Sequence, residues 1–264
     1  SREPYIIPNT EFQGYRKSAL YVTDDSWIEE QLTSWDGMVL YLDWAPDSSQ
    51  LVISARLQDL NGNGTIGADD DDRDPIRLYL VDPVTREVQP MFGDITPKDR
   101  SMYLPSWAPG GRYIAYVEGY GDADGDLVVA EVTDHSEVAR IELDAGADYQ
   151  WSPDGESIAY VGYSDRSDRG LYVDVFVWDM VTSTAKRLTR TSLYSVHSAY
   201  DLNGISLDSL VWSPDGEYLA FLWTSQGKDY VVVASVDGSQ LFRVSGPGTY
   251  YSIVAWDGRD LPGK

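Results

Sequence analysis

The sequence predicts an all-β protein made of repeated four-stranded sheets, and two observations carry this prediction. A hydrophobic run ending in Trp is followed by a tight polar turn and a second hydrophobic run, and this unit recurs along the 264 residues. The copies recur about every 44 residues, apart from two insertions, and a fixed period of this length is typical of repeat architectures. Because one such unit is too small to bury its own core, neighbouring copies must pack together.

The repeated phrase contains a turn signal directly after each Trp. Pro presets φ for the first corner of a tight turn, and Gly accepts the positive φ that such turns require. The copies are Trp44-Ala45-Pro46-Asp47, Trp107-Ala108-Pro109-Gly110, Trp151-Ser152-Pro153-Asp154-Gly155, Trp212-Ser213-Pro214-Asp215-Gly216 and Trp256-Asp257-Gly258. Five equivalent Trp positions in five repeats indicate a packing role.

Each repeat contains four hydrophobic or alternating runs, which we interpret as four antiparallel strands. In the first complete repeat the expected strands are 39–44, 50–54, 77–81 and 88–92. The strand that ends at Trp is expected to be innermost, and the fourth strand is the most polar. Sheets of this kind arranged radially, with short protected edges, form a β-propeller. The expected second, third and fourth strands of the later repeats are 113–117, 127–130, 138–141, 157–161, 173–177, 186–189, 218–222, 230–234 and 240–244.

The two ends of the chain predict how the ring closes. The last Trp ends an inner strand at 252–256, and the N-terminus offers three further strands at 5–7, 19–22 and 27–33. One C-terminal strand and three N-terminal strands would complete a fifth blade. We therefore expect a single propeller domain over 1–264 with five four-stranded blades, or six if another copy is present. The insertions lie at about 57–75 and, between blades, at about 190–207.

Composition restricts the class of partner. The formal net charge is −23 and the pI is near 4.2. Such a field repels phosphate, which disfavours nucleic acid and anionic membranes and favours cations or a basic protein surface. The same acidity also serves solubility alone. The sequence has no cysteine, which excludes disulfides, Cys-ligated zinc and a thiol nucleophile.

Neither a membrane-spanning run nor a signal peptide is visible in the sequence. The chain starts at Ser1 without Met. We therefore expect a mature or trimmed form from which a targeting segment has been removed.

The insertion at 59–70 matches a calcium-binding loop of the EF-hand and dockerin type. Oxygen-bearing side chains stand at positions 1, 3 and 5, Gly at 6, Ile at 8 and a carboxylate at 12. Calcium prefers six to eight oxygen ligands, which alternate positions of a tightly turned loop can supply. The expected ligands are Asp59, Asn61, Asn63, the Thr65 carbonyl and Asp70.

Two features depart from that loop type: position 12 is Asp instead of Glu, and predicted strands rather than helices flank the loop. A solvated acidic hairpin loop is the alternative interpretation. The stretch also contains a glycosylation sequon, Asn63-Gly64-Thr65, which metal binding explains better.

Propeller topology gathers several loops on one face, since loops between the second and third strands and loops between blades open on the same side. This face would include the calcium-like loop, the acidic loop at 121–126, the loop at 164–169 and the 190–207 insertion. It would be acidic and Tyr-rich, which suits recognition. The candidate residues are Tyr120, Asp122, Asp124, Asp126, Tyr163, Tyr194 and Tyr200. The alternative is that these loops only cover the blades.

Motifs for catalysis or a second metal are weak. Asp122, Asp124 and Asp126 lack the downstream carboxylate of a calcium loop. His135 and His197 stand in predicted loops without a matching nucleophile, and no nucleophile elbow or phosphate-binding loop appears.

Two further carboxylates, Asp148 and Asp208, precede Trp residues and could face a central channel, as in propeller glycosidases. Glycoside hydrolysis requires an acid and a partner carboxylate at a defined separation. We interpret these two residues as channel lining, and no catalytic residue is assigned.

The repeated Trp-Ser-Pro-Asp-Gly phrase, the Ile-Ala-Tyr that follows it at 158–160 and the closing Lys186-Arg187-Leu188-Thr189 together resemble the TolB-like β-propeller repeat family. The resemblance covers most of the chain. It implies an extracytoplasmic, periplasmic, cell-surface or secreted binding or scaffold module. We see no sign in this sequence of the separate N-terminal domain that TolB itself carries, so the resemblance is not expected to extend to the specific partners of TolB.

Three functional hypotheses follow. The first is a non-enzymatic extracytoplasmic propeller that binds a protein partner or joins a larger assembly, with calcium stabilising one loop. The second is a calcium-dependent glycan-binding module that uses aromatic residues on the same face. The third is a glycosidase, or the propeller of a peptidase.

Overall fold

A computed structural model of the chain describes residues 3–9, 17–23, 29–33, 37–60, 66, 74–93, 100–119, 125–143, 149–167, 170–189, 194–195, 204–205, 210–225 and 228–248. These residues form strands β1 to β21, joined by turns. Within these ranges there is no helix long and apolar enough to cross a membrane. The contacts group the chain into two compact units, Ser1–Ile141 and Glu142–Lys264, which are described separately.

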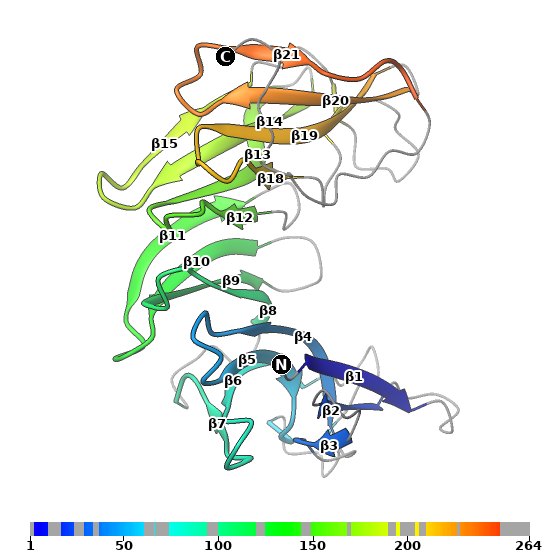
Figure 1. The fold of residues 1–264 in the computed structure, drawn as a ribbon, viewed down its shortest axis with the longest axis vertical. Helices are drawn as coiled ribbons and strands as arrows, with labels where there is room; N and C mark the ends of the chain where they lie inside the picture. The colour runs from blue at the N-terminus through cyan, green and yellow to red at the C-terminus, as the bar shows by residue number, and fades with distance from the viewer. Residues whose placement is uncertain are drawn as a thin grey trace. The chain divides into compact units, whose positions relative to one another are not determined.

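The first unit contains three antiparallel sheets in which neighbouring strands follow one another along the chain (Figure 1). The N-terminal sheet has three described strands, as the N-terminal hydrophobic runs predict. The sheets are β1 (Glu3–Asn9), β2 (Lys17–Thr23) and β3 (Glu29–Gln31); β4 (Met38–Trp44), β5 (Leu51–Arg56), β6 (Arg77–Val81) and β7 (Val88–Pro90); and β8 (Ser101–Trp107), β9 (Tyr113–Gly119), β10 (Gly125–Glu131) and β11 (Glu137–Leu143). The four-stranded sheets therefore have the predicted order, with boundaries within a few residues of the prediction.

The second unit contains two sheets of the same kind, each enlarged by one short strand. The strands are β12 (Tyr149–Trp151), β13 (Ser157–Ser167), β14 (Gly170–Asp179), β15 (Thr184–Arg187) and β16 (Tyr194–Ser195) in one sheet, and β17 (Gly204–Ile205), β18 (Val211–Trp212), β19 (Tyr218–Ser225), β20 (Lys228–Ser235) and β21 (Leu241–Arg243) in the other. We call them the β12–β16 sheet and the β17–β21 sheet. In the latter, β17 and β18 both pair with β19.

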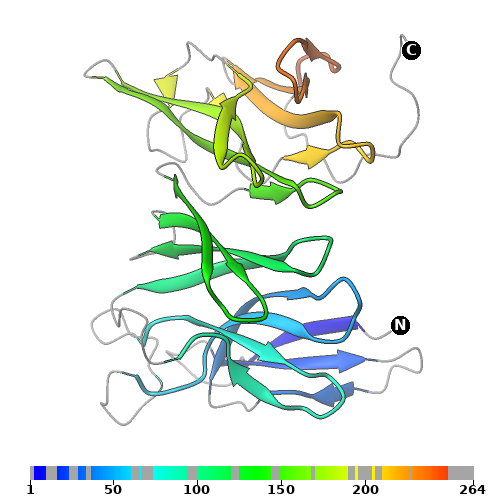
Figure 2. The same ribbon diagram turned by 90° about the vertical axis from the view of Figure 1, so that its left-hand side faces the viewer.

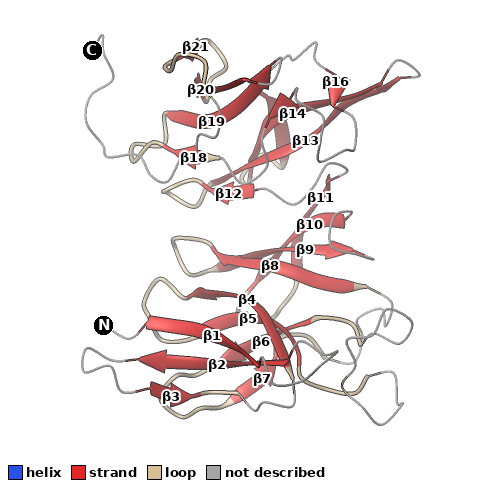
Figure 3. Ribbon diagram, turned by 90° about the vertical axis from the view of Figure 1, so that its right-hand side faces the viewer, coloured by secondary structure: helices blue, strands red, loops and turns tan. Residues whose placement is uncertain are grey.

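Two predictions in this unit are corrected by the structure. The segment 164–169 was predicted to be a loop, but β13 continues to Ser167 and β14 begins at Gly170, with a register shift between Tyr163 and Asp165. Figure 2 shows this long hairpin, coloured green to yellow-green. The 190–207 insertion was predicted to be one loop, but it contributes β16, which pairs with β14 (Figure 3), and β17, which pairs with β19.

The turns after the Trp strands have the predicted chemistry. Gly155 and Gly216 both have φ of 72°, in the left-handed region that favours Gly. In the same kind of turn Ser48 has φ of 60°, so a non-Gly residue accepts this conformation there. The Ser152 hydroxyl donates to Asp154 at 2.6 Å and accepts from the Ser157 amide at 2.9 Å, which ties the turn to the start of β13.

Sheets within each unit pack face to face, which buries their inner strands. Every residue of β5 is buried, because one face packs toward the β1–β3 sheet and the other toward the β8–β11 sheet. In the second unit, Val175 and Val177 of β14 pack with Phe221 and Val232 of the β17–β21 sheet. The continuous hydrophobic runs of the sequence reflect this burial on two faces.

The Trp residues of the repeats lie mainly in the core, as predicted. Trp107, Trp151 and Trp212 are buried, and Trp44 is partly buried against the core cluster that includes Leu51 and Ile53 of β5. In two places the residue before one Trp accepts a hydrogen bond from the backbone amide of the next repeat's Trp. Asp43 accepts from Trp107 at 2.8 Å. Gln150 accepts from Trp212 at 3.2 Å. Burial raises the pKa of Asp43 despite these hydrogen bonds.

The predicted ring closure depends on the strand at 252–256, which lies outside the described residues together with Trp256. The structure thus confirms an all-β fold of antiparallel sheets, two of them four-stranded and two four-stranded with one added short strand. The five-bladed closed ring remains a prediction.

Candidate functional site

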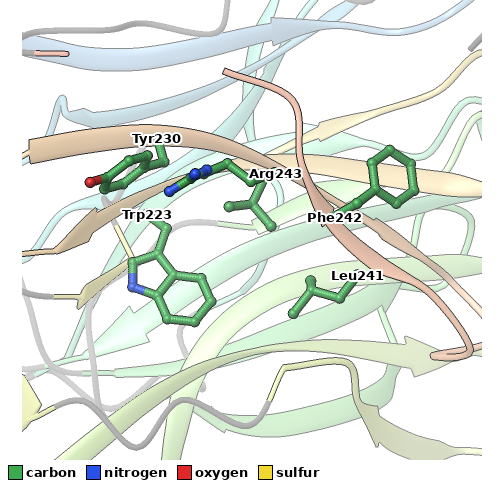
Figure 4. A pocket seen from close by; sticks show the side chains of 6 residues that line it. Trp223, Tyr230, Leu241, Phe242 and Arg243 are labelled. Carbon is green, nitrogen blue, oxygen red and sulfur yellow. The ribbon is translucent and has the colours of Figure 1, made fainter. Parts of the chain in front are cut away.

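A cavity of about 470 Å³ lies on the β17–β21 sheet (Figure 4). Its volume is within the range of roughly 300–1,000 Å³ that is usual for small-ligand pockets. The walls come from three adjacent strands: Trp223 from β19, Tyr230 and Val232 from β20, and Leu241, Phe242 and Arg243 from β21.

The alternation of side chains along the strands explains this lining. Side chains two residues apart point to the same face of a sheet, so Leu241 and Arg243 share a face with Tyr230 and Trp223, as Figure 4 shows. Phe242 points to the opposite side of β21, where its ring lies 6.5 Å from the ring of Tyr218. The cavity is therefore aromatic and aliphatic, with a single cationic group.

The Arg243 guanidinium lies 4.7 Å from the centre of the Tyr230 ring, within the range of a cation–π contact. Among the described residues, no carboxylate forms an ion pair with Arg243. The indole Nε1 of Trp223 is buried and also has no hydrogen-bond acceptor there. The Arg243 side chain is exposed, so water can satisfy its donors, whereas the Trp223 indole N–H is buried without an acceptor among the described residues, which is uncommon for a buried donor.

The β12–β16 sheet has a different arrangement at the equivalent position. Asp174 is fully buried, accepts a hydrogen bond from the Thr189 hydroxyl at 2.6 Å and forms an ion pair with Arg187 at 2.5 Å. The register places Arg187 opposite Phe176 and Arg243 opposite Val232. Asp174 stands two residues before Phe176, and Tyr230 stands two residues before Val232. Asp174 and Tyr230 therefore occupy equivalent positions in their sheets.

The comparison with known proteins agrees with this fold. No family model matches the chain. The Tol-Pal system protein TolB of Alcanivorax borkumensis is 29% identical over 108 residues, which are 41% of this chain and 19% of that protein. The crystal structure of TolB from Acinetobacter baumannii has a TM-score of 0.57 at 17% identity, covering 92% of this chain and 52% of that chain.

This chain has a TolB-like β-propeller fold. The resemblance predicted from the repeated Trp phrase is confirmed, and a putative TolB from Agrobacterium tumefaciens also matches, with a TM-score of 0.51 and 16% identity over 87% of this chain and 74% of that one. The TolB-like chain spans about half the length of the Acinetobacter TolB, 52%.

The same TolB-like fold also occurs in enzymes. An oligogalacturonate lyase in complex with manganese matches with a TM-score of 0.62 at 15% identity, covering 89% of this chain and 62% of that one. An acylaminoacyl peptidase of Pyrococcus horikoshii matches with a TM-score of 0.58 at 11% identity, covering 92% and 37%. At these identities the likeness concerns the fold, so catalysis has to be argued from residues.

The base of the predicted calcium loop is held together by hydrogen bonds. The Asp74 side chain accepts a hydrogen bond from the Leu60 amide at 2.7 Å, and its backbone carbonyl accepts from Arg56 Nε at 2.7 Å. Asp59, the first predicted ligand, is exposed beside this link. The other predicted ligands, Asn61, Asn63, Thr65 and Asp70, lie outside the described residues.

The structure gives a definite environment to one residue of the predicted interaction face. Asp126 forms an ion pair with Arg140 at 2.9 Å, and Arg140 also pairs with Glu118 at 2.8 Å. The Asp126 charge is therefore compensated within the β8–β11 sheet. Tyr163 lies in β13 at the register shift, and Tyr194 lies in β16 opposite Tyr172. Tyr120, Asp122, Asp124 and Tyr200 lie outside the described residues.

Of the weak candidates for catalysis, His135 lies within the described residues. His135 lies in the turn between β10 and β11, where its ring is 5.9 Å from the ring of Phe92. In the described ranges no cluster of three His, Cys, Asp or Glu side chains could hold a metal ion. Asp148, Asp208 and His197 lie outside these ranges.

Sequence reasoning missed the cavity, although a signal for it exists. The phrases Arg187-Leu188-Thr189 and Arg243-Val244-Ser245 close two repeats in the same way. Placing the repeats in register shows that the acidic partner of the first Arg is replaced by Tyr230 beside the second. Only the strand pairing reveals that these positions are equivalent.

Proposed function

We propose that this chain is a non-enzymatic, extracytoplasmic protein-binding propeller with a calcium-stabilised loop at 59–70. The observation that carries the proposal is the likeness to TolB in both sequence and fold, because the curated relative is named as a protein of the Tol-Pal system. Such a system implies association between proteins. The chain matches only part of these relatives, so its own partner is inferred from chemistry.

The distribution of burial supports a binding role. In both units neighbouring sheets cover part of the sheet faces: both faces of β5, and the face of β14 that carries Val175 and Val177. The cavity on the β17–β21 sheet is left for a partner. The net charge of −23 favours a partner whose surface is basic.

The calcium proposal rests on the spacing of the oxygen ligands and on the closed base of the loop. The Leu60 amide and the Asp74 carboxylate join the two ends of the insertion. Joining the ends reduces the conformational entropy that a metal ion must overcome when it orders the segment between them. Hence we expect calcium to raise the melting temperature.

Calorimetric titration with CaCl₂ and thermal unfolding in calcium and in chelator test this proposal. We expect one site, an increase in melting temperature with calcium concentration, and loss of both effects in Asp59→Asn. The matched control is Asp72→Asn, which removes one charge from the same acidic stretch outside the twelve-residue motif. Equal losses in the two variants, or no binding by the wild-type protein, would contradict the calcium site.

The protein-binding role is tested by cross-linking in intact cells, followed by reconstitution of each candidate complex from purified proteins. A complex re-formed at micromolar concentrations supports the proposal. Turnover of aryl glycosides or peptide amides, abolished by Asp148→Asn or Asp208→Asn, would contradict it. Calcium-dependent binding on a glycan array without any protein complex would replace it with the glycan-binding alternative.

A further inference from the structure

The cavity on the β17–β21 sheet has a chemical character that defines its ligand. The one charged group of its lining is the exposed Arg243 guanidinium, which has no carboxylate partner among the described residues and keeps its N–H donors available to a ligand. Val232, Leu241 and the Trp223 ring provide an apolar wall beside them. A complementary ligand carries an acceptor-only anion within a few ångströms of an apolar group.

The geometry at Arg243 favours a carboxylate as that anion. The Tyr230 ring covers one face of the guanidinium, at 4.7 Å, and this contact uses no N–H donor. The donors of a guanidinium lie in its plane and form a fork that matches the two oxygens of a carboxylate. Stacking on Tyr230 therefore fixes the direction of the guanidinium N–H donors but gives them no hydrogen-bond acceptor.

The equivalent position in the β12–β16 sheet shows what such an Arg binds when the protein supplies the partner. There the Arg187 guanidinium pairs with the Asp174 carboxylate at 2.5 Å. In the β17–β21 sheet Tyr230 replaces that Asp, and a cavity of about 470 Å³ adjoins the Arg. Within the described part of the chain, the carboxylate that pairs with Arg187 in one sheet has no counterpart beside Arg243 in the other.

We propose that this cavity binds the C-terminal residue of a partner protein, with its α-carboxylate on Arg243 and an apolar side chain against Val232, Leu241 and Trp223. A chain terminus brings a carboxylate and an apolar group onto one carbon, whereas an acidic side chain lacks the apolar flank. The overall charge of −23 favours a terminus preceded by basic residues. This inference rests on the proposed protein-binding function and names the chemistry of one contact.

The test uses N-acetyl-leucine and its neutral carboxamide as probes, followed by a basic hexapeptide that ends in leucine as the free acid or as the amide. Binding is measured by calorimetry and by NMR titration. We expect the acid to bind about tenfold or more tightly than the amide, as a charge-assisted pair of hydrogen bonds predicts. Equal affinities of acid and amide, or no binding of the hexapeptide acid, would overturn the inference.

Variants locate the site. Arg243→Gln is expected to weaken binding of the acid about tenfold or more, and Tyr230→Asp to weaken it similarly by giving Arg243 an internal carboxylate, while Tyr230→Phe retains binding. The matched control is Arg112→Gln, since Arg112 also stacks on a tyrosine, Tyr113, at 4.9 Å but already pairs with Glu131. Unchanged binding in Arg243→Gln, or an equal loss in Arg112→Gln, would place the ligand elsewhere.

Failure of this inference is distinguishable from failure of the proposed function. A reconstituted protein complex that forms equally well with Arg243→Gln would retain the protein-binding role and reject the cavity as its contact. Absence of any complex with the wild-type protein would reject the role itself.

Discussion

The β12–β16 and β17–β21 sheets close their repeats with the same backbone geometry but use their Arg residues differently. In both sheets a hydroxyl after the fourth strand accepts the hydrogen bond of a third-strand amide: Thr189 from Val175 at 3.0 Å, and Ser245 from Val231 at 2.9 Å. One Arg is neutralised by a buried Asp, and the other is stacked on a Tyr. The comparison teaches that a repeat can keep its closure while a single exchange, Asp to Tyr, changes a structural ion pair into a candidate binding group.

The N-terminal sheet shows that closure of a repeat by a hydroxyl does not depend on the Arg. Thr33 accepts a hydrogen bond from the Leu20 amide at 2.8 Å, so the closure by a hydroxyl is also present there. The residue two positions before that Thr is Gln31, which donates to the Thr33 carbonyl at 2.5 Å. Arg187 makes the same contact with the Thr189 carbonyl at 2.8 Å. The hydroxyl is thus the common element of closure, and the cation is optional.

The largest expected difference between the two sheets concerns the Arg residues. Arg187→Ala leaves the fully buried Asp174 without its counter-charge, which costs about 3 kcal/mol of the free energy of unfolding. Arg243→Ala removes a surface cation–π contact worth about 0.5–1 kcal/mol. Urea denaturation of both variants measures the difference. Equal losses would mean that the two Arg residues have the same structural role.

A smaller difference is expected at the closing hydroxyls. Thr189→Val removes an acceptor for the Val175 amide and a donor to Asp174, so we expect a loss of about 2 kcal/mol. Ser245→Ala removes an acceptor for the partly buried Val231 amide, which costs about 1 kcal/mol. Denaturation midpoints measure both values. A greater loss in Ser245→Ala would contradict the assignment of the buried network to the β12–β16 sheet.

The repeat pattern predicts most of the fold because the strands and turns are specified by residues that are close together in the sequence. Pro and Gly set the turns after the Trp strands, and continuous apolar runs specify strands that are buried on both faces. The extension of β13 to Ser167 escaped prediction, since Ser164, Asp165 and Arg166 are turn-like in composition. Strand pairing, which is a non-local property, decides their conformation.

The candidate site was less predictable from the sequence. The acidic calcium-like loop is visible because its ligands are close in sequence. The cavity brings Trp223, Tyr230 and Arg243 together from three strands, and no linear motif records their shared face. Asp126 shows the opposite case: its acidic loop resembled a recognition surface, but Arg140, fourteen residues later, neutralises it.

The smallest effect is expected where the two sheets are alike, in the turns between their third and fourth strands. Hydrogen bonds from the Ser235 and Ser239 hydroxyls and the Ser239 amide lower the pKa of Asp237 to about 2. The Thr182 amide likewise lowers the pKa of Asp179. A carboxyl group with a lowered folded-state pKa contributes stability that is fully present above its unfolded pKa, near 3.9, and is lost as the pH falls through the folded value.

Asp179→Asn and Asp237→Asn should therefore both lose less melting temperature than the wild-type protein between pH 5 and pH 2. Circular dichroism melts across this range measure the effect. A steeper loss in either variant would contradict the assignment of these carboxylates as turn acceptors.

The most direct test of the central claim, that the Tyr230 exchange leaves Arg243 available to a carboxylate ligand, is an NMR titration of the indole N–H signals with N-acetyl-leucine. We expect the Trp223 signal to shift, because its ring forms a wall of the cavity. The Trp107 signal should not move, because Trp107 lies in the β8–β11 sheet; its Nε1 is likewise buried and has no acceptor among the described residues. A shift of Trp223 that is absent in Arg243→Gln supports the account, and unchanged or equally shifted signals of the two Trp residues would contradict it.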